Sequence, residues 1–200
     1  MYLGYNSRWI LRQLECILPF SEDHIDNKWS DLAVVTILLG ANDSVDPTSS
    51  QHVPLNEYTD NITQIINHIR RINSRVKIIL ITPPRVDSNQ WPTRAESVVS
   101  LYADAIRLLS IDLGTHLIDT WGGISAEPVH CPLDNEGNVC DIRLDDLRDG
   151  LHLGVEGNKK LANCIMKLIR NELPHLCPDT SHAPISLSWQ CPLWTNMAEL

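Results

Sequence analysis

The sequence predicts an α/β fold in which a parallel sheet lies between two layers of helices, a three-layer α/β/α arrangement. Three short runs are continuously apolar and rich in β-branched residues, at positions 32–39, 76–82 and 115–120. Stretches with helical spacing of apolar residues separate these runs and follow the last of them. Apolar runs without polar alternation are typical of parallel strands buried on both faces, so a doubly wound sheet is expected.

Each expected helix has one apolar side, and most have a clear stop signal. The helix expected over residues 8–18 stops before Pro19, and the helix expected over residues 94–113 stops before Gly114. Two further helices are expected over residues 56–72 and 155–171. The apolar positions of the four stretches are Ile10, Leu14, Ile17 and Leu18, then Tyr58, Ile62, Ile65, Ile66, Ile69 and Ile72, then Val98, Leu101, Tyr102, Ala105, Leu108 and Leu109, and finally Leu161, Ile165, Leu168 and Ile169.

The expected strands are bounded by residues that interrupt regular structure. The first run lies between Asp31 and Gly40, and the second stops at Pro83. Residues 122–148 are rich in Gly, Pro, Asp and Asn and are expected to form a loop. With 43% hydrophobic residues the chain can close one core, which predicts a single domain over residues 1–173. Residues 174–200 hold four prolines without periodicity and predict a tail that packs on the domain or is partly disordered.

The charge and hydropathy of the chain exclude several classes of partner. The net charge is -9, and no basic run is longer than the pairs Arg70-Arg71 and Lys159-Lys160. Nucleic acid and anionic membranes are therefore not expected partners. The longest apolar run is too short to span a bilayer, and the first residues do not resemble a secretory signal. No membrane insertion is expected, and the expected location is cytoplasmic.

The six cysteines indicate neither a metal site nor a disulfide framework. They form no CxxC pair, and no His/Cys spacing in the chain is typical of zinc. We expect reduced thiols and no bound metal. A disulfide between Cys131 and Cys140 stays open as the alternative for an oxidising compartment.

Two polar motifs follow predicted strands, at the sheet edge where ligands bind in open α/β folds. Gly40-Ala-Asn42-Asp43 follows the first strand, and Asp149-Gly-Leu-His152 precedes the last helix. An Asp three residues before a His can orient the imidazole as a general base, and an Asn amide can donate to a developing oxyanion. Taken alone, the Asp149–His152 spacing is more typical of a solvated loop pair than of a catalytic pair, and the Asn42 turn is equally typical of an Asx turn that caps the strand.

Together with the block Gly4-Tyr-Asn-Ser-Arg-Trp9, these motifs resemble the SGNH (GDSL-like) hydrolases, and within them the isoamyl acetate-hydrolysing esterase group. The resemblance implies a flavodoxin-like three-layer fold and hydrolysis of small to medium neutral esters without a cofactor. It implies that His152 is the base and Asp149 its orienting partner. It also implies that the Gly4 N–H and the Asn42 amide form the oxyanion hole. Asp43 is expected to brace the loop behind them.

One part of the family pattern is absent from the 200 residues. The family nucleophile is the Ser of a Gly-Asp-Ser motif upstream of the Gly4 block, and neither Gly-Asp-Ser nor G-x-S-x-G occurs here. Ser7 and Ser44 lie in blocks with other family roles and are not expected to replace it. The expectation is therefore an N-terminally truncated enzyme, whose strand at residues 32–39 has an unpaired edge. The alternative is a non-catalytic SGNH-like binding protein, and homo-oligomerisation stays open for both.

Overall fold

The structure, a computed structural model, describes residues 4–19, 29, 32–121 and 139–176. It contains three parallel strands, β1 (Val34–Leu38), β2 (Lys77–Ile81) and β3 (His116–Ile118), in the order β1-β2-β3. Val34 pairs with Lys77 in the first register, and Ile79 pairs with His116 in the second. The predicted parallel sheet is confirmed. The limits of the predicted domain, residues 1–173, stay a prediction, and Cys131 and residues 177–200 lie outside the described residues.

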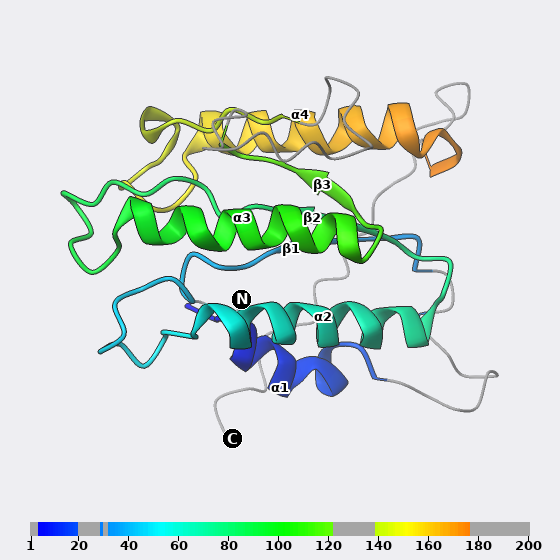
Figure 1. The fold of residues 1–200 in the computed structure, drawn as a ribbon. Coiled ribbons are helices and arrows are strands. Elements are labelled where there is room, and N and C mark those ends of the chain that lie inside the picture. Colours follow the sequence, from blue (N-terminus) through cyan, green and yellow to red (C-terminus); the bar gives the residue numbers. More distant parts are fainter. Residues whose placement is uncertain (1–3, 20–28, 30–31, 122–138, 177–200) are drawn as a thin grey trace, which may run out of the picture.

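Four α-helices cover the two faces of the sheet (Figure 1). They are α1 (Ser7–Ile17), α2 (Leu55–Ile72), α3 (Glu96–Asp112) and α4 (Val155–Glu172). Short 3₁₀ helices, η1 (Leu144–Asp146) and η2 (Pro174–Leu176), flank α4. Alternate side chains of β2 divide the core, because Ile78 and Leu80 pack with α2 and α3 whereas Ile79 and Ile81 pack with α4. The three-layer α/β/α prediction is therefore confirmed.

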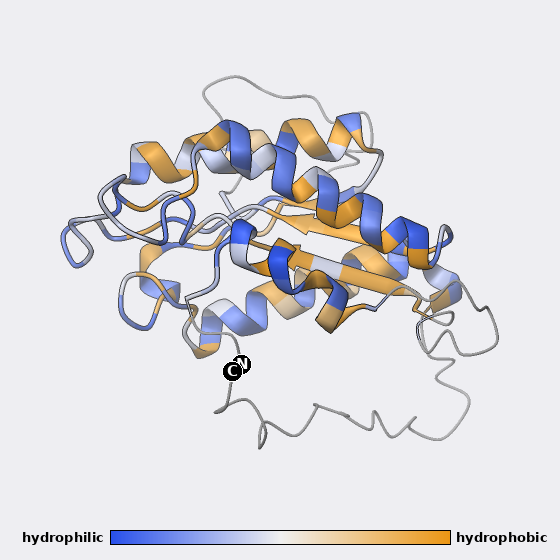
Figure 2. Ribbon diagram, turned by 90° about the horizontal axis from the view of Figure 1, so that it is seen from below, coloured by the Kyte–Doolittle hydropathy of each residue, from blue (hydrophilic) through white to orange (hydrophobic). Residues whose placement is uncertain are grey.

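Hydropathy explains why these elements dock as they do. Figure 2 shows strands that are almost continuously hydrophobic between helices that are hydrophobic along only part of their surface. Helix α2 turns a stripe of isoleucines into the larger core, where Ile62 and Ile66 are fully buried. Helix α1 begins after Asn6, whose side chain accepts a hydrogen bond from the Trp9 N–H and so satisfies one free donor of the first turn.

Two details of the predicted burial are wrong. The run at residues 32–39 was expected to be buried on both faces, yet Thr36 is exposed and Leu38 is 38% exposed. Strand β1 pairs only with β2 among the described residues, so it lies at the edge that the sequence predicted, and α4 packs mainly on β2 and β3. Helix α3 exposes Leu101 and Leu108 and buries Val99 instead. Apolar residues occur on most sides of α3, so spacing alone could not select the buried side.

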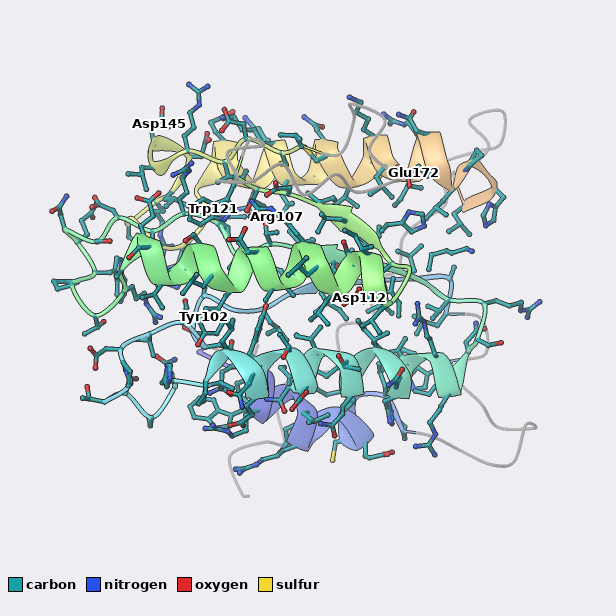
Figure 3. The ribbon with its side chains drawn as sticks, in the orientation of Figure 1. Tyr102, Arg107, Asp112, Trp121, Asp145 and Glu172 are labelled. Carbon is teal, nitrogen blue, oxygen red and sulfur yellow. The ribbon has the colours of Figure 1, made fainter. Side chains whose placement is uncertain are left out.

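Side chains on opposite sides of α3 connect it to α2 and to the segment that follows β3. In Figure 3 Tyr102 leaves α3 toward α2, and its ring lies 5.0 Å from that of Tyr58. Its hydroxyl donates to the Val53 carbonyl at 2.6 Å. Arg107 leaves the other side and donates to Asp119, just after β3, at 2.8 Å. These contacts fix α3 between α2 and the end of β3.

Candidate active site

Three loops meet at the end of the sheet where the strands terminate. They are residues 39–54 after β1, residues 82–95 after β2, and residues 147–153 before α4, and Figure 1 shows all three at the same end of the molecule. The second loop contacts the third directly, since the Asp87 N–H donates to the Gly150 carbonyl at 2.8 Å. Carboxyl ends of parallel strands are the usual place for a site in an open α/β fold.

The turn after β1 has a backbone conformation that requires glycine at its first position. Gly40 has φ +119°, and a Cβ there would lie 2.9 Å from the Tyr58 hydroxyl. The Ser44 N–H donates to the Gly40 carbonyl at 2.9 Å and closes the turn. As a result Asn42 is half-buried in the turn, while Asp43 points inward and is 1% exposed.

Asp43 connects this turn to the first helix. Its Oδ1 accepts a hydrogen bond from the Ser7 N–H at 2.8 Å. Burial raises the pKa of the Asp43 carboxyl, and the hydrogen bonds from Ser7 oppose that shift. The Ser7 hydroxyl in turn accepts from the Asn61 side chain at 3.0 Å. Asp43 therefore contacts the backbone that leads into α1 rather than any exposed position.

The structure brings Gly4 and Asn42 together. The Asn42 side-chain amide donates to the carbonyl of Tyr5, the residue after Gly4, at 2.9 Å. The Gln51 amide donates to the Gly4 carbonyl at 2.8 Å, and Gly4 has φ +76°. The Gln51 carbonyl accepts from the Asn6 side chain at 2.7 Å. The block at residues 4–9 and the turn after β1 thus form one hydrogen-bonded unit.

The structure also pairs Asp149 with His152. Asp149 Oδ2 lies 2.8 Å from His152 Nδ1, and because a carboxylate only accepts, Nδ1 carries the hydrogen. Asp149 Oδ1 accepts the His152 N–H at 2.9 Å. These backbone and side-chain hydrogen bonds from His152 hold the pKa of Asp149 well below its usual range. The His152 side chain is 58% exposed, and no described residue is hydrogen-bonded to its Nε2.

Backbone contacts fix the loop that carries this pair. The Arg148 N–H donates to the His152 carbonyl at 2.7 Å, and the Gly154 N–H donates to the Asp146 carbonyl at 2.8 Å. Gly150, at the tip of the loop, has φ +78°, where a Cβ would lie 2.9 Å from the Cβ of Asp87. Gly154 is the N-cap of α4, a position where glycine is well tolerated.

The loop after β2 connects the other two loops, although the sequence alone assigned no site role to any residue in it. Trp91 donates its indole N–H to the Asp149 carbonyl at 2.8 Å and packs edge-on against His152, with ring centroids 6.2 Å apart. Arg94 donates to Asn42 Oδ1 at 3.0 Å, and its guanidinium lies 5.7 Å from the Trp91 ring. A contiguous series of contacts therefore runs from His152 through Trp91 and Arg94 to Asn42.

The serines nearest these loops are buried and already hydrogen-bonded. Ser7 is fully buried, and Ser44 is 1% exposed with its hydroxyl 3.4 Å from the Ala41 carbonyl. Within the described ranges no three His, Cys, Asp or Glu side chains gather as a metal site would require. Among the same residues, no helix combines the length and apolar composition needed to cross a bilayer.

Comparison with known proteins identifies the family. The GDSL-like lipase/acylhydrolase family matches residues 3–160. The chain belongs to this family. It is 31% identical to the isoamyl acetate-hydrolyzing esterase 1 homolog of Mus musculus, over 99% of this chain and 74% of that protein. It is also 31% identical to a GDSL esterase/lipase of Arabidopsis thaliana, over 86% of this chain and 71% of that protein.

Solved structures agree with the GDSL-like fold. The lipase/acylhydrolase from Enterococcus faecalis superposes with a TM-score of 0.61 at 22% identity, covering 88% of this chain and 74% of that one. Axe2, an acetylxylan esterase from Geobacillus stearothermophilus, gives a TM-score of 0.55 at 21% identity, covering 83% and 68%. The fold class and the family that the sequence motifs indicated are thus confirmed. Membership of this family indicates an esterase or acylhydrolase function.

Proposed function

We propose that this chain supplies the base and the oxyanion hole of a Ser-His-Asp ester hydrolase that acts on small to medium neutral esters. Two arrangements support the proposal together. Asp149 fixes the tautomer of His152, and Asn42 is fixed beside the Gly4 turn. The proposed substrates are acetate esters of small alcohols, because the mammalian relatives are named as isoamyl acetate-hydrolyzing esterase homologs.

Each proposed role follows from the chemistry of its group. Asp149 binds the Nδ1 hydrogen, so the Nε2 lone pair of His152 accepts the proton of a serine hydroxyl as that oxygen attacks the ester carbonyl. The Gly4 N–H and the Asn42 amide donate to the oxyanion of the tetrahedral intermediate. The His152 imidazolium then gives its proton to the departing alkoxide. A water attacks the acyl-serine by the same steps in reverse, and the free acid leaves.

Asp43 is proposed to brace this arrangement without touching substrate. Its contact with the Ser7 N–H fixes the turn after β1 against the start of α1, which are the two segments that carry Asn42 and Gly4. The contact is almost completely buried, so its geometry is insulated from solvent.

The nucleophile is proposed to be absent from these 200 residues. They contain no Gly-Asp-Ser motif, and both nearby serines are buried with hydrogen-bonded side chains. The chain expressed as printed is therefore expected to hydrolyse short-chain p-nitrophenyl esters hardly at all. Residual catalysis from an oxyanion hole alone is on the order of 10³ over water. A fluorophosphonate probe, which labels activated serines, is expected to leave the chain unmodified.

A chimaera provides the decisive experiment. A segment with the family's Gly-Asp-Ser motif, taken from a relative, is fused ahead of residue 1, and p-nitrophenyl acetate hydrolysis is measured. Activity is expected to appear in the fusion and to disappear with His152→Ala, whereas the control His175→Ala, at an exposed histidine on η2, retains it. Robust turnover by the unfused chain that depends on His152, or a folded fusion without activity, would overturn the proposal.

A further inference from the structure

Arg94 is a deeply buried cationic side chain next to the proposed site. It lies in the loop between β2 and α3 and is 5% exposed. Its Nη1 donates to the Ala41 carbonyl at 2.5 Å, and its Nη2 donates to Asn42 Oδ1 at 3.0 Å. One guanidinium therefore contacts both the backbone and the side chain of the turn that follows β1.

The charge of Arg94 has no carboxylate partner within the part of the chain that the structure describes. Its neighbours are amide and carbonyl oxygens and the ring of Trp91. Its Nε is buried, and no described residue accepts from it. Burial lowers the pKa of the Arg94 guanidinium. An unpaired buried cation is unfavourable for folding, so its presence at this position indicates a functional use of the charge.

Arg94 and the Tyr5 carbonyl together determine which way the Asn42 amide points. A guanidinium has only donors, so the atom of Asn42 that faces it must be the oxygen. The nitrogen then faces the Tyr5 carbonyl, which only accepts. One amide hydrogen goes to Tyr5, and the second is left for another acceptor. Without Arg94 only the contact with the Tyr5 carbonyl would select this orientation, and the Asn42 amide would be held less firmly.

Arg94 also reaches the residue that contacts Gly4. Gln51 Oε1 lies 3.5 Å from Arg94 Nη2, and Gln51 Nε2 donates to the Gly4 carbonyl at 2.8 Å. The same guanidinium nitrogen thus lies near Asn42 itself and near the side chain that contacts Gly4.

We propose that Arg94 is a positioning residue for the oxyanion hole, which orients the Asn42 amide through Oδ1 and increases its strength as a donor. This inference rests on the proposed function, because it gives Asn42 the role of an oxyanion donor. Arg94 is too deeply buried to contact substrate and acts through the turn that carries Asn42. A positive charge on the carbonyl side of an amide polarises it, so its N–H becomes a better donor to an anion.

The first test uses the 200-residue chain and needs no catalysis. The side-chain amide of Asn42 is observed by 15N–1H NMR and assigned from its disappearance in Asn42→Asp. Arg94→Met is expected to shift the Asn42 amide and to speed its hydrogen exchange. The matched control Arg85→Met lies in the same loop, but Arg85 contacts Glu96 and Trp121 instead and should leave the signal in place. An Asn42 amide signal unaffected by Arg94→Met in a folded chain would refute the proposal.

The second test measures catalysis in the chimaera described above. Arg94→Met is expected to lower kcat by about 10²- to 10³-fold with little change in KM, as for loss of one oxyanion donor. Arg94→Lys keeps a charge but cannot contact Ala41 and Asn42 with a planar fork, so its kcat should fall in between. In the double variant Asn42→Ala with Arg94→Met, the losses should not multiply.

The two tests separate failure of this inference from failure of the proposed function. An inactive chimaera that still shows the Arg94-dependent amide shift refutes the esterase proposal and leaves the orientation of Asn42 established. An active chimaera in which Arg94→Met keeps full kcat refutes the positioning role alone. Multiplying losses in the double variant would also refute it, because they would show that Arg94 acts independently of Asn42.

Discussion

Replacement of Gly150 by Ala is expected to destabilise the protein more than the same change at Gly114. Both glycines have positive φ, +78° and +57°, so alanine at either position costs about 1–2 kcal/mol of backbone strain. At Gly114 the new methyl meets no atom within 4 Å. At Gly150 it would lie 2.9 Å from the Cβ of Asp87, which cannot move without the backbone. Overpacking of this kind adds about 1–3 kcal/mol.

Urea unfolding of the two variants, followed by far-UV circular dichroism, measures this difference directly. Because the strain is common to both, the free energy of unfolding should fall by about 1–3 kcal/mol more for Gly150→Ala than for Gly114→Ala. The His152 Nδ1 hydrogen, observed by NMR, should shift only in Gly150→Ala, since the loop from Asp149 to His152 must move away from Asp87. Equal losses of stability, within about 0.5 kcal/mol, would refute the contact between these loops.

Three further predictions concern the packing around the site. Asp43→Ala should lower the free energy of unfolding by about 1–3 kcal/mol, because the buried Ser7 N–H loses its acceptor. Asp43→Asn should lower it less at neutral pH. Because burial raises the pKa of Asp43, its carboxyl takes up a proton as the pH falls and the wild-type protein loses the buried charge. Any gain in stability that Asp43→Asn has from carrying a neutral amide instead of that charge should therefore shrink in acid. Leu168→Ala, at a 1% exposed position on α4, should lose about 2–5 kcal/mol, whereas Leu101→Ala, 51% exposed, should change stability by less than about 0.5 kcal/mol. Arg107→Met should lose about 3–5 kcal/mol by leaving the Asp119 charge without its cationic partner, and adding Asp119→Asn should recover part of that loss in the same urea assay.

Most of the fold could be predicted because apolar spacing and strand length are local properties. The predicted strand at 76–82 is observed as Lys77–Ile81, and the predicted helix at 56–72 as Leu55–Ile72. The errors arose where a neighbour decides burial. Thr36 and Leu38 lie in an apolar run, yet their exposure depends on how far α4 extends over the sheet. No pattern within residues 32–39 contains that information.

The site was predicted in part for a similar reason. Asp149 and His152 are three residues apart, so their contact is local and visible in the sequence. Arg94 and Asn42 are 52 residues apart, and an arginine in a polar loop is normally interpreted as a solvated charge. One signal was available: residues 82–95 follow the second strand and so face the same edge of the sheet as the two motifs that were recognised.

The sparse burial of α4 has a consequence for the dynamics of His152, the proposed base. Only Gly157 and Leu168 are buried on this helix, whereas α2 buries eight residues. In native-state hydrogen exchange the amides of α4 should therefore open at lower free energy than those of α2. The loop that carries His152 runs directly into α4, so opening of α4 is expected to displace the imidazole while the α2 side of the sheet, with Asn42 beside it, stays folded. The two halves of the proposed site are thus expected to unfold locally at different free energies, the His152 half at the lower one.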